Sequence, residues 1–126
     1  MQGKHLFEYA IIRVVPRVER EEFLNVGVIL YCKKEGFLKS RYLLDEHRLK
    51  CFAGFDLEDV KEHLDSFARI CNGDKTGGAI AQMDIASRFR WLTATRSTVV
   101  QASKVHPGFA ASAAEKLDRL FEQLVA

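Results

Sequence analysis

Several residue patterns that would identify a function are scarce or missing in this chain of 126 residues. The two prolines and three cysteines are too few for a proline-rich linker or a disulfide scaffold, and no C-x-x-C pair is present. A disulfide framework and a zinc site are therefore not expected. The cysteines lie in apolar surroundings, which predicts buried free thiols in a reducing cytosol for Cys32, Cys51 and Cys71.

Long hydrophobic runs are also missing. No stretch approaches the length that a membrane span needs. The first ten residues, "MQGKHLFEYA", contain one lysine and no long apolar run before Glu8, so no signal peptide is predicted. We expect a cytoplasmic protein with no membrane contact.

A large excess of charge of one sign is absent, because 19 basic residues nearly balance 17 acidic ones, for a net charge of +2. A dedicated nucleic-acid binder usually shows clustered Lys and Arg, so this balance neither excludes nor favours nucleic acid. Acidic residues outnumber basic ones within residues 51–75, so the rest of the chain is more basic. We therefore expect positive and negative charge to be distributed slightly unevenly over the surface.

Familiar catalytic and metal-binding motifs are absent as well. No nucleophile elbow, Cys-His signature or metalloprotease helix occurs. The four histidines show no ligand spacing with one another or with cysteine: they are His5, His47, His63 and His106. Adjacent Asp45, Glu46 and His47 are predicted to be a solvated turn. We therefore expect no metal and no cofactor, and a binding protein rather than an enzyme.

The chain does contain enough apolar residues, 48%, to build one core, and a single domain over residues 1–126 is predicted. Residues 6–15 are rich in β-branched and aromatic types and are apolar on both faces, so this strand should lie in the middle of a sheet and end at Pro16. Residues 25–33 predict a second strand, where Gly27 allows a bulge or a close backbone approach. Residues 37–44 predict an edge strand, and residues 97–103 predict the last one.

Helical spacing and capping residues predict three helices. One begins at the N-cap Asp56 and ends at residues 72–73, one covers residues 80–94, and one begins at the capping box Ser112 to Glu115. Residues 45–54 fit either a short strand or a helical turn, and "KVHPGF" is predicted as a turn. The order β-β-β-α-α-β-α favours an α+β fold, with an antiparallel sheet of about four strands backed by about three helices.

Arg13 is the most distinctive candidate, because a cation in an apolar strand needs a partner. The following loop supplies carboxylates, and Glu22 is the preferred partner, with Asn25 bonding the loop backbone. In this interpretation the three residues are a structural tie. The alternative is that Arg13, Glu22 and Asn25 line a cleft and bind a polar group.

A second candidate is "RFRWLTATRS", residues 88–97, where arginines flank Trp91. Arg88, Arg90 and Arg96 could contact phosphate while Trp91 offers a stacking face. The simpler interpretation places Trp91 in the core and the arginines on a solvated helix face.

Two segments of the chain resemble a known family. "YAIIRVVPRVEREEFLNVGVILYC" and "RFRWLTATRSTVVQASKVHPG" are similar to sequences of the bacterial family catalogued as domain of unknown function 3037, DUF3037. The matching positions are Tyr9, Arg13, Pro16, Glu22, Phe23, Asn25, Gly27, Arg88, Arg96 and Ser97. The family has no assigned activity, but the resemblance implies a protein partner, a HipA-like kinase.

Two functions follow from these observations. The first is a non-enzymatic accessory or protein-interaction domain that binds a HipA-like kinase. The alternative is a phosphate or nucleic-acid binding domain, with hydrolysis as its enzymatic form, that uses an Arg/Glu/Asn site together with the arginines of residues 88–97. The candidate binding or structural residues for these functions are Arg13, Glu22, Asn25, Gly27, Arg88, Arg96 and Ser97.

Overall fold

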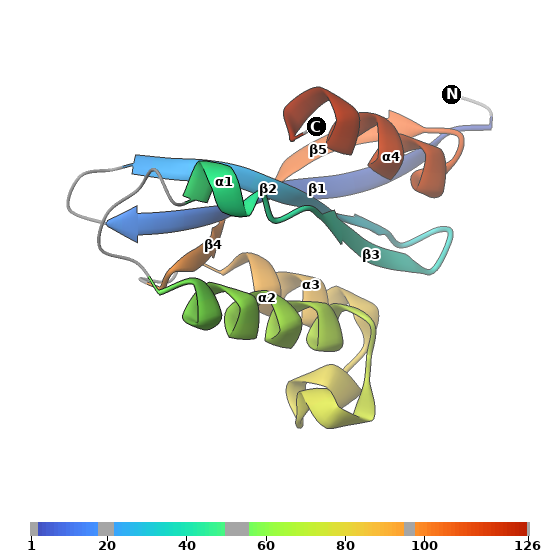
Figure 1. Cartoon of the computed structure of the whole chain (residues 1–126). Helices are drawn as coiled ribbons and strands as arrows, with labels where there is room; N and C mark the ends of the chain where they lie inside the picture. Colours follow the sequence, from blue (N-terminus) through green and yellow to red (C-terminus); the bar gives the residue numbers. More distant parts are fainter. Residues whose placement is uncertain (1–2, 18–21, 50–55, 95–97, 126) are drawn as a thin grey trace.

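The fold is an antiparallel sheet with helices on both faces, which confirms the α+β class (Figure 1). The computed structural model describes residues 3–17, 22–49, 56–94 and 98–125, with only the backbone for 16, 17 and 22. The strands are β1 (His5–Arg17), β2 (Glu22–Cys32), β3 (Phe37–Tyr42), β4 (Val100–Ala102) and β5 (His106–Ala110). The helices are α1 (Glu46–Leu49), α2 (Leu57–Cys71), α3 (Ile85–Thr93) and α4 (Ala113–Leu124), with short 3-10 turns η2 (Lys75–Gly77) and η3 (Ile80–Gln82).

β1 is the central strand, as its apolar sequence predicts. Its first edge pairs with β2, and β3 follows β2 at the edge of the sheet. Its second edge pairs with β5 near the N-terminus and with β4 further along. Between these two short strands, Ser103 bonds to the backbone of Ile11 through both its N–H and its hydroxyl, each at 2.8 Å. β1 is thereby held on both sides from Glu8 to Val14, and His5–Phe7 pair with β5 alone.

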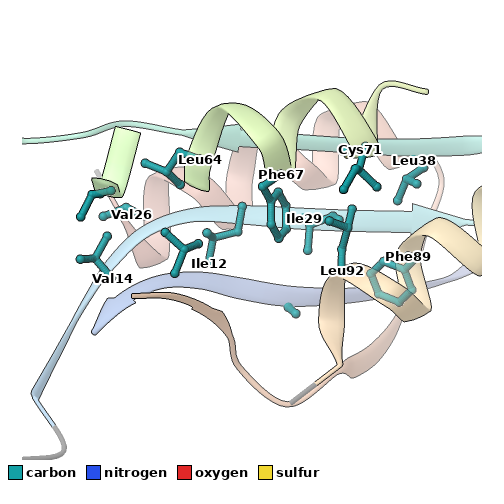
Figure 2. Close-up of a cluster of buried hydrophobic side chains, with 14 of the residues drawn as sticks. Ile12, Val14, Val26, Ile29, Leu38, Leu64, Phe67, Cys71, Phe89 and Leu92 are labelled. Atoms are coloured by element: carbon teal, nitrogen blue, oxygen red, sulfur yellow. The ribbon is translucent and has the colours of Figure 1, made fainter. Parts of the chain in front are cut away.

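The two faces of the sheet are covered differently. In Figure 1, α2 and α3 lie on one side of the strands and α4 lies on the other. The larger apolar cluster joins β1 and β2 to α2 and α3, and Figure 2 shows Phe67 of α2 and Phe89 of α3 directed at the strands. The smaller cluster joins Phe7, Val28 and Leu30 to α4.

A bulge in β2 sets which residues face which side. Ile12 pairs with Gly27 while Arg13 pairs with Asn25, so Val26 is the extra residue. Gly27 is needed there because β3 passes very close: a Cβ on this residue would lie 2.6 Å from the Arg41 carbonyl oxygen and 2.6 Å from the Tyr42 Cβ. Both the bulge and the close approach expected at Gly27 are present.

The prediction of a turn at "KVHPGF" is wrong for its second half, because His106–Ala110 form β5. Proline and glycine signal a turn locally, but Pro107 is tolerated on an edge strand. Gly108 pairs with Phe7 and leaves room for its ring, since a Cβ would lie 2.5 Å from Phe7 Cζ. The contact with β1 therefore overrides the local preference.

Other boundaries shift for similar reasons. β1 continues through Pro16 to residue 17, beyond its predicted end. The helix predicted over 80–94 is divided into η3 and α3, with Asp84 as N-cap of α3. The last predicted strand shortens to β4. Residues 46–49 take the helical alternative, and residues 50–55 lie outside the described part.

The helix starts follow the predicted caps. The Asp56 carboxylate accepts a hydrogen bond from Glu58 N at 3.0 Å, and the Ser112 hydroxyl accepts one from Glu115 N at 3.3 Å. The Glu35 carboxylate, from the turn after β2, accepts another from Ala113 N at 2.9 Å. These bonds fix both helices at their N-terminal ends, and the last one ties α4 to the sheet.

Candidate functional site

Arg13 lies on the α4 side of the central strand. Its neighbours Ile12 and Val14 are fully buried in the cluster with α2 and α3, so strand alternation directs Arg13 to the opposite face. There it pairs across the sheet with Asn25 of β2 and Gln101 of β4. Two amide side chains therefore come from the positions on either side of this arginine.

The guanidinium of Arg13 stacks on an exposed aromatic ring. Its Cζ lies 4.2 Å from the centroid of the Phe23 ring, and Phe23 is 48% exposed although it belongs to a strand. Stacking of this kind at an exposed site contributes about 0.5–1 kcal/mol.

Asn25 connects this pair to the end of α4. Its Nδ2 donates a hydrogen bond to the Leu124 carbonyl oxygen at 3.4 Å, which satisfies one of the last carbonyl groups of the helix. Within the described part of the chain, Asn25 Oδ1 and Arg13 Nε are buried and have no hydrogen-bond partner. One buried acceptor and one buried donor thus lie unpaired, among the described residues, at partnered positions of two strands.

A hollow of about 260 Å³ opens beside these residues, at the C-terminal end of α4. Arg48 of α1 is exposed at its wall, and its backbone N–H donates to the Asp45 carboxylate at 3.2 Å. We call this region the Arg13 surface. It comprises Arg13 and the residues that line the hollow: Phe23, Leu24, Asn25, Arg48, Leu124 and Val125.

The chemistry of the Arg13 surface is that of binding. Its described residues supply two guanidinium groups, one amide and apolar contacts, and none of them is a histidine, carboxylate, thiol or hydroxyl that could transfer a proton or attack a substrate. A site of this composition can hold an anionic or amide group against an aromatic ring.

Arg88 lies across the sheet from Arg13, on α3, and is used to hold the fold. Its two terminal nitrogens donate to the Met83 carbonyl oxygen at 3.0 Å and to the Cys71 carbonyl oxygen at 3.5 Å. It therefore joins the end of α2 to the start of α3. The neighbouring Cys71 thiol is buried, which raises its pKa to about 11, while Ser40 and Arg88 act in the opposite direction.

Arg90 is engaged separately. It forms a two-pronged ion pair with Glu8 of β1, with the longer nitrogen–oxygen distance at 3.1 Å. The hydrogen bond from Arg90 lowers the pKa of the Glu8 carboxyl group, and partial burial of Glu8 opposes this effect. Arg88 and Arg90 thus have different partners, and neither shares a face of the sheet with Arg13.

The remaining candidates are placed as follows. The Glu22 backbone pairs with residue 17, but its side chain is outside the described part, so its ion pair with Arg13 stays a prediction. Arg96 and Ser97 also lie outside the described residues. Gly27 lies against β3 and serves packing.

Besides its aliphatic lining, the surface contains two residues that were missed as functional candidates, Phe23 and Arg48. Phe23 stands two positions before Asn25, and strand alternation could have placed both side chains on one face. Arg48 carries no such signal. It reaches the surface only because α1 lies near the end of α4, which is a tertiary contact.

The described residues contain no cluster of three or more His, Cys, Asp or Glu side chains that could hold a metal ion. Within the same ranges no helix has the length and apolar character to cross a membrane. Cys32 and Cys71 are free and buried.

Comparison with known proteins gives one match. The family described as "Protein of unknown function (DUF3037)" matches residues 9–125, which is nearly the whole chain. No curated protein and no solved structure matches the chain.

Proposed function

The chain belongs to the DUF3037 family of proteins of unknown function, and we propose that it is a non-enzymatic accessory domain that binds a partner protein through the Arg13 surface. The first partner to test is a HipA-like kinase. In this proposal the protein works in the bacterial cytoplasm, where the thiols of Cys32 and Cys71 stay reduced.

One observation carries the proposal: the exposed ring of Phe23 has the guanidinium of Arg13 stacked on it. Aromatic and arginine side chains are the residues that most often dominate the binding energy of protein interfaces. The ring is 48% exposed, so it contributes little to the core, and its stacking with Arg13 distinguishes it from another exposed ring, that of Phe109.

The shape of the surface supports the same function. The hollow beside Phe23 can accept a side chain of a partner, and the exposed side chain of Arg48 at its wall can hydrogen-bond a polar group of that partner.

The alternative, a phosphate or nucleic-acid site, has less support. It needs several arginines on one surface, whereas Arg88 and Arg90 lie on the other side of the sheet from Arg13 and are bonded to Met83, Cys71 and Glu8.

The test is binding of the purified full chain to the HipA-like kinase encoded in the same genome, measured by titration calorimetry. We expect a complex, and Phe23→Ser should weaken it by about 2 kcal/mol because the ring is the apolar anchor. Phe109→Ser is the matched control, since Phe109 is 56% exposed on β5 and lies outside the Arg13 surface.

The proposal fails if the kinase does not bind, or if the two substitutions weaken binding equally. Mixed-sequence oligonucleotides are titrated in parallel. Binding of oligonucleotides that falls steeply with salt would favour the nucleic-acid alternative.

A further inference from the structure

The charges around the Arg13 surface specify the kind of segment that it can bind. Its lining contains the exposed side chain of Arg48 and the ring of Phe23, on which the Arg13 guanidinium is stacked. Among the described residues that line the hollow there is no carboxylate. The Asp45 carboxylate accepts the backbone N–H of Arg48 at the start of α1.

These two arginines are also not engaged in ion pairs with other described residues. The ion pairs within those ranges belong to Arg41, Lys61, His63 and Arg90. Their acidic partners are Asp118, Glu46, Glu58, Asp59 and Glu8. Among the described residues, the guanidinium groups of Arg13 and Arg48 are therefore without an acidic partner.

One acidic surface of the protein lies on the other side of the sheet from Arg13. Helix α2 presents four exposed carboxylates, which are Glu58, Asp59, Glu62 and Asp65. This helix packs on the face opposite to Arg13 (Figure 1). An acidic segment would meet like charges on α2, whereas the described lining of the hollow contains no carboxylate.

We infer that the Arg13 surface binds an acidic segment of a partner protein, with a carboxylate on Arg13 and Arg48 and a nearby apolar side chain on Phe23. This inference rests on the proposed function and adds the chemistry of the partner. The carboxylate forms charge-assisted hydrogen bonds with the guanidinium groups, and the apolar residue removes the Phe23 ring from water.

The test uses a phage-displayed library of short random peptides selected on the immobilised full chain. We expect the enriched peptides to contain Asp or Glu next to an apolar residue. A synthetic peptide from this set should bind about tenfold more weakly to Arg48→Gln, and a version with Asn and Gln in place of its acids should lose a similar factor. Raising the salt concentration should weaken binding of the original peptide.

Arg119→Gln is the matched control, because it removes the same charge from an exposed position on α4 that does not line the hollow. It should bind the peptide like the wild type. Arg13→Gln is measured as well, and its melting temperature shows whether it is folded. If it is not, Arg48→Gln alone decides, since Arg48 is exposed.

The inference is overturned if no peptide is enriched, if the enriched peptides are neutral or basic, or if Arg48→Gln and Arg119→Gln behave alike. It is also overturned if a single-stranded oligonucleotide binds more tightly than the peptides and if its binding depends on Arg48.

The experiments distinguish this inference from the proposed function. If the kinase binds through Phe23 but the enriched peptides are not acidic, the proposed function stands and this inference is rejected. Acidic peptides bound at Arg48 without kinase binding would reject the kinase and keep the inference.

Discussion

The two faces of the sheet treat their arginines in opposite ways. On the face covered by α2 and α3, Arg88 donates to two carbonyl oxygens and joins two helices. On the face of α4, Arg13 lies on an exposed ring beside a hollow. Both have a buried Nε without a partner among the described residues. The difference shows what decides whether a half-buried arginine stabilises the fold or is free to bind another molecule. The deciding factor is whether its terminal nitrogens reach hydrogen-bond acceptors of the protein itself.

The extent of burial differs in the same direction. The α2 and α3 face contains Phe89, Leu64 and Leu49, which are 0–2% exposed, whereas the α4 cluster is smaller and leaves one end of β1 and β2 uncovered by that helix. The first face therefore supplies most of the stability. The second face leaves part of the sheet uncovered by α4, and this part can contact another molecule.

The largest effect should come from truncation within the fully buried face. Phe89→Ala removes a ring that packs against Tyr31 with centroids 5.3 Å apart, and we expect a loss of about 4 kcal/mol in the free energy of unfolding. Urea denaturation measures it. Phe109→Ala is the control and should cost less than about 1 kcal/mol, because Phe109 is exposed. Equal losses would contradict the assignment of the two positions.

Substitution at Gly27, next to the β2 bulge, should lower the free energy of unfolding by nearly as much. Gly27→Ala introduces a methyl group 2.6 Å from β3 and should cost about 3 kcal/mol through strain and displacement of that strand. In Gly36→Ala the new Cβ meets no atom and only the positive φ of 59° is strained, so the loss should be about 1 kcal/mol. Urea denaturation measures both losses. If Gly36→Ala loses more free energy of unfolding than Gly27→Ala, the close approach of β3 does not restrict residue 27.

The two arginines give the sharpest test of the comparison. Arg88→Met leaves the carbonyl groups of Met83 and Cys71 without their donor and should lower the free energy of unfolding by about 2 kcal/mol. Arg13→Met should cost less than about 1 kcal/mol, because it loses mainly its contact with an exposed ring. Thermal and urea denaturation give both values. Equal losses would instead support the structural ion pair predicted between Arg13 and Glu22.

The smallest effect concerns the ion pair between Glu8 and Arg90. The folded protein holds the pKa of Glu8 below its ordinary value of 4.5, so the stabilisation is present above that pH and is lost as the pH falls through the lowered pKa. Glu8→Gln should destabilise the protein at pH 7 by less than about 1 kcal/mol, because Arg90 is largely exposed. The two proteins should converge in stability at acid pH. If the difference in stability between the wild type and Glu8→Gln persists below the pKa of Glu8, it arises from packing and not from the ion pair.

The sequence was sufficient for the elements whose stability is local. Asp56 and Ser112 mark the starts of two helices because a side-chain oxygen bonds a nearby N–H whatever lies around it. The apolar run of residues 6–15 predicted a central strand from the residue types of one segment. Gly27 indicated a bulge or a close backbone approach, but the strand that approaches it, β3, is known only from the structure.

Only the tertiary structure decided the features that join distant segments. β5 forms from a proline and a glycine because β1 supplies its hydrogen bonds and Phe7 fills the space above Gly108. The roles of Arg88 and Arg13 depend on carbonyl oxygens and a ring contributed by other elements. Arg48 joins the surface because α1 lies near the end of α4. A long charged side chain takes its role from whichever groups the fold brings within its reach, and spacing along the chain does not encode that distance.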